Sequence, residues 1–241
     1  SNNAKIRFSA TFDLGQHVDT SVIEQDLVSY TYFDLGLNVR YNHSPKFGLG
    51  AGTSYSLRNY QTGNVSERPY RDFATLPLYA SAFYIYSEKL DFYTQYGFSQ
   101  TKGSGTTTAN LTDSSSHSIS FGANGDFTPK LNGNAQAGYT VVNFDNPNNP
   151  NQGNLTLGVG LDWRLNNKSS FGLDLDRSFS PSGQGFSMFS TMAKLHASHR
   201  LTQDVTATAH LSYGVVEYTY ANMPKIALKD SSSLNQFGMG F

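Results

Sequence analysis

Residues 154–165 read NLTLGVGLDWRL, and large apolar residues alternate there with small, polar or charged ones. The odd positions are apolar: Leu155, Leu157, Val159, Leu161, Trp163 and Leu165. The even positions between them are not: Thr156, Gly158, Gly160, Asp162 and Arg164. Because successive residues of a β-strand point to opposite faces, this stretch predicts a strand with one apolar and one polar face.

The same alternation recurs from end to end, and no window of eleven or more residues sustains the apolar spacing of an amphipathic helix. The chain is therefore predicted to be all-β. Twelve strands are expected, at about 4–13, 28–42, 47–59, 73–86, 90–101, 117–127, 131–144, 154–165, 169–178, 185–200, 204–219 and 232–241. Most of these strands would be long enough to cross a bilayer, because a tilted strand needs about 9–11 residues to do so.

The connections between these strands fall into two alternating classes. Five are short turns of Ser, Thr, Pro, Asn and a charge, at 43–46, 87–89, 128–130, 166–168 and 202–204. Six are longer and polar, near 14–27, 60–72, 102–116, 145–153, 179–184 and 220–231. Tight turns at one rim and longer loops at the other are typical of transmembrane up-and-down β-barrels, with the turns periplasmic and the loops extracellular.

Composition limits the alternatives. Only 15% of the 241 residues are charged, where a soluble domain has about a quarter. No stretch approaches the roughly 20 apolar residues of a spanning helix. The net charge of -1 gives no basic surface for nucleic acid, and the absence of cysteine removes disulfides and thiol chemistry. No linker interrupts the pattern, so residues 1–241 are expected to form one domain.

A soluble β-sandwich would show the same alternation, and three features favour the membrane barrel over it. The face opposite the apolar one carries Gly and Ser rather than charge. Aromatic residues gather near both strand ends, as in the two aromatic girdles of membrane barrels. The last strand alternates Phe237, Met239 and Phe241, which resembles the C-terminal signature of bacterial outer-membrane proteins.

The polar face of a closed barrel would line its lumen, with a backbone radius of about 12 Å for twelve strands. Fourteen ionisable residues are assigned to this face: Arg7, Asp34, Arg40, Arg58, Asp91, Asp126, Asp162, Arg164, Asp174, Asp176, Lys194, His196, Arg200 and His210. They would either set the selectivity of a narrow water path or pair into salt bridges that satisfy a buried interior. The sequence leaves both interpretations open.

The strand at 73–86 departs from the pattern because it is apolar or aromatic on both faces. Pro77 lacks the backbone N–H that a closed ladder would pair, so a bulge is expected near it. The second face is expected to pack against an inward loop or a partner protein. Its candidate residues are Phe73, Pro77, Tyr79, Phe83 and Ile85.

Catalytic signals are weak. His196-Ala197-Ser198 has the His-x-Ser spacing of lipid-hydrolysing outer-membrane barrels, but it lies on the inward register and close to a short turn. Asp174 and Asp176 share a face without further carboxylates around them, so salt bridges within the lumen are favoured over metal chemistry. The sequence predicts no catalytic residues, no metal site and no cofactor.

Two hairpins carry a resemblance to a known family. SHSISFGANGDFTPKLNGNAQAGY at 116–139 and FDLGLNVRYNHSPKFGLGAGTSYS at 33–56 resemble the repeated hairpins of the putative β-barrel porin 2 family. The resemblance implies a Gram-negative outer-membrane barrel, often associated with exopolysaccharide or capsule export.

Three functions follow as hypotheses. The first is a porin-like channel that passes a polar or saccharide solute, embedded in outer-membrane lipid with both termini periplasmic. The second is a closed-lumen barrel that anchors or docks a protein partner of an envelope complex. The third, which the position of His196 disfavours, is an outer-membrane lipid hydrolase.

Overall fold

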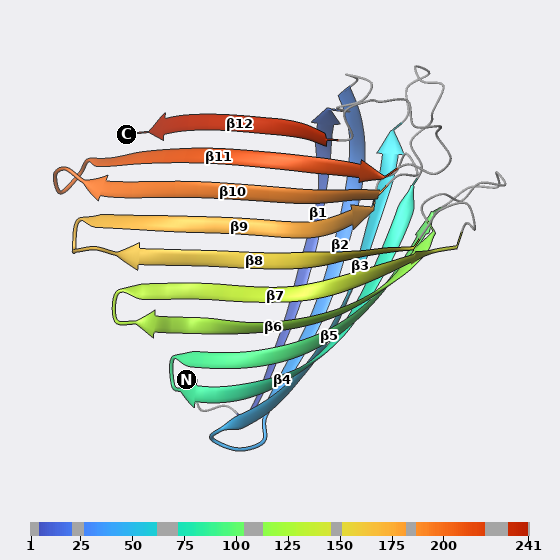
Figure 1. Ribbon diagram of the computed structural model, residues 1–241, viewed down its shortest axis with the longest axis horizontal. Helices are drawn as coiled ribbons and strands as arrows, with labels where there is room; N and C mark the ends of the chain where they lie inside the picture. The colour runs from blue at the N-terminus through green and yellow to red at the C-terminus, as the bar shows by residue number, and fades with distance from the viewer. Residues whose placement is uncertain are drawn as a thin grey trace.

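The computed structural model describes residues 5–20, 27–61, 72–103, 113–145, 151–181, 187–219 and 231–240, and these form a single twelve-stranded antiparallel sheet. Its strands are β1 (Ile6–Thr20), β2 (Leu27–Asn42), β3 (Phe47–Gln61), β4 (Phe73–Ser87), β5 (Leu90–Gly103), β6 (Ser114–Thr128), β7 (Leu131–Phe144), β8 (Gln152–Arg164), β9 (Ser169–Pro181), β10 (Ser187–Arg200), β11 (Thr206–Thr219) and β12 (Ser231–Gly240). Each strand pairs with its neighbours in sequence (Figure 1). The predicted all-β, up-and-down architecture with twelve strands is confirmed.

The sheet curls strongly, so that β1 to β3 run at a steep angle to β7 to β12 (Figure 1). In the described part of the chain β1 pairs only with β2 and β12 only with β11, so these two strands are the edges of an open sheet. The expected closure of the barrel is therefore not formed. No described segment is a helix long and apolar enough to cross a membrane.

The strands run further toward the long loops than predicted. β1 continues to Thr20, paired with Leu27, although 14–27 was expected to be a loop. β6 begins at Ser114, paired with Phe144, instead of at 117. Backbone ladder bonds do not require apolar side chains, so polar residues extend these strands beyond the apolar band.

Side-chain oxygens close the short turns. The first polar residue of a turn accepts hydrogen bonds from the backbone N–H groups two and three residues later, as in Asx and Ser/Thr turns. Asn166 accepts from Lys168 (2.8 Å) and Ser169 (2.9 Å), Thr128 accepts from Lys130 (3.3 Å) and Leu131 (3.0 Å). Ser44 and Thr202 repeat the arrangement in their own turns.

Each turn is also tied to the next hairpin along the rim. The backbone N–H of Arg164 donates to the carbonyl of Lys130, and that of Arg200 donates to the carbonyl of Lys168, both at 2.8 Å. The ammonium of Lys130 reaches the carbonyl of Leu165 at 3.1 Å. The short-turn rim is thus a continuous hydrogen-bonded edge, and it holds the ends of β8 to β11 at fixed positions.

Gly125 and Gly133 face each other across β6 and β7 with φ of 131° and 145°. Residues with a Cβ rarely adopt this region. A Cβ at either position would also collide with backbone, that of Lys89 or that of Gly160. Glycine is required at both positions, and the register shift between Asp126 and Thr128 follows directly after Gly125.

The predicted bulge at Pro77 is wrong. Pro77 pairs in register with Ser99 of β5, and β3 and β4 keep one register on both sides of it, from Thr53 opposite Leu78 to Ser56 opposite Thr75. Between these two residue pairs, β3 and β4 are not paired. The lost N–H is accommodated without an extra residue, and the irregularity in β4 lies between Ile85 and Ser87 instead.

The turn geometry yields a prediction. Asn166→Ala removes the acceptor for two backbone N–H groups and should lower the free energy of unfolding by about 1 kcal/mol. Urea titration of the folded chain in detergent, followed by the fluorescence of its single tryptophan, Trp163, measures this. Asn167→Ala is the matched control and should change stability by less than about 0.5 kcal/mol. Equal effects of the two substitutions would contradict the capping role.

Candidate functional site

The strand registers divide the sheet into an outer and an inner face. Large apolar side chains on the outer face are exposed, with Phe8 at 69% and Leu155 at 70%. Along β4 the inner residues are buried or half-buried while their outer neighbours are mostly exposed, as expected for the concave side of a curled sheet. The registers place all fourteen residues predicted to line a lumen on the inner face.

Aromatic pairs mark the outer face beside the short turns. Ring centroids lie 5.6 Å apart for Phe47 and Tyr84, and 6.5 Å apart for Trp163 and Phe171. The predicted belt on the loop side is only partly outward, because Tyr30, Tyr32 and Phe73 lie on the inner face. Phe241 and the side chains of its strand lie outside the described residues.

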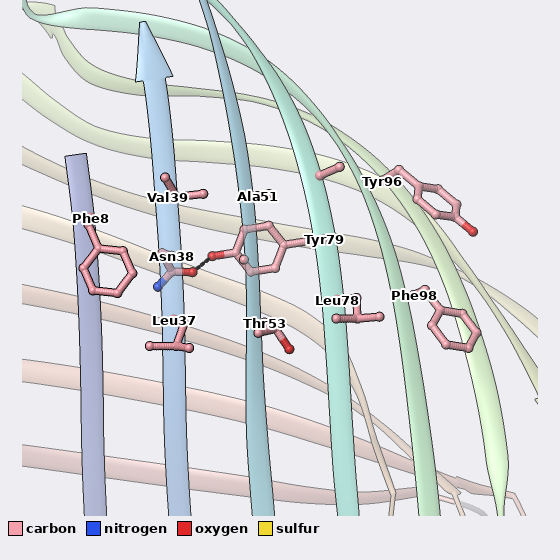
Figure 2. A pocket seen from close by; sticks show the side chains of 12 residues that line it. Phe8, Leu37, Asn38, Val39, Ala51, Thr53, Leu78, Tyr79, Tyr96 and Phe98 are labelled. Carbon is pink, nitrogen blue, oxygen red and sulfur yellow. Dashed lines mark hydrogen bonds between the residues drawn. The ribbon is translucent and has the colours of Figure 1, made fainter. Parts of the chain in front are cut away.

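A shallow groove of about 540 Å³ crosses the outer face of β1 to β5 (Figure 2). Small residues such as Ala51 and Ala80 line it together with larger ones, including Phe8, Leu37 and Phe98. A groove lined almost entirely by apolar side chains fits a lipid chain better than a polar solute.

The first charged cluster on the inner face joins β2 to β5. Arg40 forms a salt bridge with Asp91 at 2.8 Å, and both side chains are about four-fifths buried (22% and 20% exposed). The guanidinium also lies 4.2 Å from the ring centroid of Phe83 on β4. The pair spans two intervening strands, and the ring of Phe83 lies over Gly50 of β3, where a Cβ would collide with it.

The aromatic residues of β4 face inward and contact the chain itself. Tyr79 donates a hydrogen bond to Asn38 of β2 and lies over Gly52 of β3 (Figure 2). Phe83 packs against Tyr93 of β5, with centroids 6.0 Å apart.

The guanidinium carbon of Arg58 lies 5.6 Å from the ring centroid of Phe73, which is within cation–π distance. Both residues lie on the inner face, together with Pro77 and Ile85. The double apolar character of this strand is therefore explained by packing within the inner face.

A second inner cluster occupies β8 to β11 and is arranged in rows across the strands. The row nearest the short turns runs from Arg164 through Ser170 to Ser198. The next row runs from Asp162 through Gly172 and His196 to His210. Deeper still, Asp174 lies opposite Lys194, and Asp176 opposite Met192. Positive and negative groups are thus mixed along this wall, within rows as well as between them.

His196 connects two carboxylates. Its Nε2 lies 3.3 Å from Asp162 and its Nδ1 lies 3.5 Å from Asp174. The imidazole crosses β9 directly over Gly172, where a Cβ would collide with the ring. Gly172 is therefore the residue that allows a histidine on β10 to reach an aspartate on β8.

This geometry does not assemble a hydrolase triad. His196 and Ser198 share the inner face two residues apart, but the ring nitrogens of His196 face aspartates, and Ser198 lines a separate hollow. Within the described residues, no group of three or more His, Asp or Glu side chains is arranged to hold a metal ion.

Sequence reasoning missed two kinds of residue. The sequence predictions do not include Gly172, although a glycine opposite a histidine on the polar face of the next strand is a recognisable signal. Lys130 and Lys168 were assigned only to turns, yet they line a hollow shared with Arg164 and Arg200. That grouping depends on tertiary proximity, which spacing in the sequence does not show.

An antiparallel sheet of long strands with an apolar, aromatic-edged outer face and a polar inner face belongs to the class of membrane β-barrel proteins. Residues 51–227 match the family described as "Putative beta-barrel porin 2", and the chain belongs to this family. This confirms the resemblance seen in the hairpins and implies an outer-membrane, porin-like protein. A porin family also suggests a non-enzymatic function.

Solved structures of low identity resemble the chain. A Pseudomonas aeruginosa FadL homologue shares 12% identity at a TM-score of 0.46, over 90% of this chain and 68% of that one. The translocator domain of the autotransporter NalP from Neisseria meningitidis shares 14% identity at 0.42, over 96% and 86%. The TodX monoaromatic hydrocarbon channel shares 13% at 0.40, over 97% and 78%. No curated protein matches the chain.

The contact between Gly172 and His196 yields a prediction. Gly172→Ala should lower the free energy of unfolding by about 1–3 kcal/mol, because the new methyl group displaces the imidazole from above β9. In a His196→Ala background the same substitution should cost at least about 1 kcal/mol less, since the ring is gone. A double-mutant cycle by urea titration measures the difference. Additive effects would show that the ring does not lie over Gly172.

Proposed function

We propose that the chain forms an outer-membrane channel that passes a small polar or saccharide solute along its inner face. One observation carries the proposal: all fourteen predicted ionisable residues lie on one face, and large exposed apolar residues lie on the other. In a bilayer the outer face contacts lipid, so the inner face is where polar groups meet water.

The charges on the inner face suit a polar solute of modest specificity. Among the fourteen residues six are Arg or Lys and six are Asp, and they form local pairs such as Arg40 with Asp91. The amide side chains of Gln136 and Asn134 lie beside the inward glycines Gly158 and Gly160. Hydroxyl and amide groups beside the charges are suited to hydrogen bonding with sugars.

The proposed topology places the short turns and both termini in the periplasm. Lys5, just before β1, accepts a hydrogen bond from the N–H of Asn42 beside the first short turn, and β12 ends opposite Thr208 near the last one. Both ends of the sheet thus lie at the short-turn rim. In membrane barrels the short turns are periplasmic.

Conduction requires the barrel to close, and we expect β1 to pair with β12. The strand number is even, so these two edges run antiparallel, as closure of an up-and-down barrel demands. An open edge would leave ladder N–H and C=O groups unpaired in hydrocarbon, at a cost of several kcal/mol per group.

The link to exopolysaccharide export belongs to this proposal as its finer part. It is supported by the resemblance of the hairpins to a family often associated with such export.

The docking alternative is motivated by the two apolar faces of β4. The inward residues Tyr79 and Phe83 of this strand contact the chain itself, which weakens that motivation. The hydrolase alternative has no assembled triad to support it.

Planar bilayers test the channel directly. The purified chain should give conductance steps above an empty bilayer, and Arg40→Ala should shift selectivity toward cations. A unit charge about 10 Å from the ion path contributes about 0.4 kcal/mol in water, roughly a twofold change in permeability ratio. Low salt maximises the shift, since screening weakens it.

Leu49→Ala, an outer-face substitution on β3, is the control and should leave selectivity unchanged. Liposome swelling in a neutral disaccharide tests passage of a saccharide in the same preparation. If wild type and Arg40→Ala both show no conductance above the empty bilayer, the channel proposal is wrong.

A further inference from the structure

A polar hollow of about 490 Å³ lies at the short-turn end of the inner face, between β7 and β11. Four cationic residues line it: Lys130, Arg164, Lys168 and Arg200. No carboxylate is among its lining residues. The hollow therefore differs from the rest of the inner face, where acidic and basic groups lie side by side, as Arg40 and Asp91 do.

The cations of the hollow are not neutralised within the described chain. None of the ion pairs formed by the described residues involves Arg164, Lys168 or Arg200. Lys130 donates to a backbone carbonyl, that of Leu165, at 3.1 Å. The carboxylates nearby along the strands have other partners, Asp162 with His196 and Asp126 with Lys89.

Hydrogen-bonding side chains complete the lining. Ser170 and Ser198 are paired across β9 and β10, next to Arg164, and Thr206 is paired with Arg200 across β10 and β11. These hydroxyls lie on the same face as the two guanidinium groups. Guanidinium groups and hydroxyls are the donors that proteins use for carboxylate and phosphate oxygens.

Local structure fixes the backbone that carries the cations. The backbone N–H of Arg164 is bonded to Lys130 and that of Arg200 to Lys168, so the four residues belong to two linked pairs along the rim. The Asn166 cap holds the turn that carries Lys168. Like charges gathered on such a fixed frame repel one another, and a bound anion relieves that repulsion.

We infer that this hollow binds the carboxylate or phosphate group of a soluble, saccharide-sized solute at the short-turn mouth. The inference rests on the proposed function and names the chemical class of its solute. The volume lies within the 300–1,000 Å³ range of small-molecule sites. Because Arg164, Ser198 and Arg200 point to the inner face, the source is a solute in the water path and not a lipid headgroup in the surrounding bilayer.

Isothermal titration of the full chain in a non-ionic detergent tests the inference, with glucuronate as the probe and glucose as its neutral counterpart. Glucuronate should bind, and glucose should bind at least tenfold more weakly. The double variant Arg164→Gln/Arg200→Gln should weaken glucuronate binding by about a hundredfold, at roughly tenfold for each charged hydrogen bond lost. Lys46→Gln changes a turn lysine outside the hollow and should leave the affinity unchanged.

Three outcomes would overturn the inference: equal binding of glucose and glucuronate, an unchanged affinity in the double variant, or an equal loss in Lys46→Gln. A fourth outcome concerns phosphatidylglycerol added to the micelles. If this lipid binds preferentially and glucuronate does not displace it, the hollow binds lipid headgroups instead. Bilayer conductance of the same sample separates the two proposals. Conductance without glucuronate binding removes only the anion site, whereas binding without conductance removes only the channel.

Discussion

Strand register is the constraint on which the rest of the structure depends. Because side chains alternate with a period of two, a slip of one residue would move every apolar side chain of a strand to the polar face. Five capped short turns, those that start at Ser44, Ser87, Thr128, Asn166 and Thr202, hold the hairpins against such a slip. Once register is set, lipid contact and a polar interior follow on opposite sides of a single sheet.

Glycines on the inner face decide which charges meet. A strand spacing of about 4.8 Å keeps side chains on alternate strands apart unless the strand between them carries little bulk. Gly172 lets His196 reach Asp162, and Gly50 makes room for the ring of Phe83, over which the guanidinium of Arg40 lies where it pairs with Asp91. The inner surface is therefore a set of short bridges that cross individual strands, with an unneutralised basic hollow at one rim.

Alternation and turn chemistry allowed the strands, the turns and the facing of the fourteen inner residues to be predicted, because these depend on neighbours in sequence. The extent of the strands toward the long loops was not predicted. Polar residues such as Ser114 form the backbone hydrogen bonds of a β-ladder just as apolar residues do. The bulge at Pro77 was wrong because one missing N–H is tolerated within an unchanged register. The partners of Arg40 and His196, and the hollow around Arg200, depend on proximity across several strands, which the sequence pattern does not encode.

The central claim is that one face of the sheet meets lipid and the other meets water. The chain has no cysteine, so single cysteines report on each face without background. The experiment compares Ser120→Cys on the inner face with Ala137→Cys on the outer face of the adjacent strand. Sealed membrane vesicles that contain either variant are treated with a membrane-impermeant maleimide, and the rate of labelling is measured. A thiol in hydrocarbon does not ionise and stays unreactive. The account predicts labelling of Ser120→Cys at least tenfold faster than of Ala137→Cys, and equal or reversed rates would contradict it.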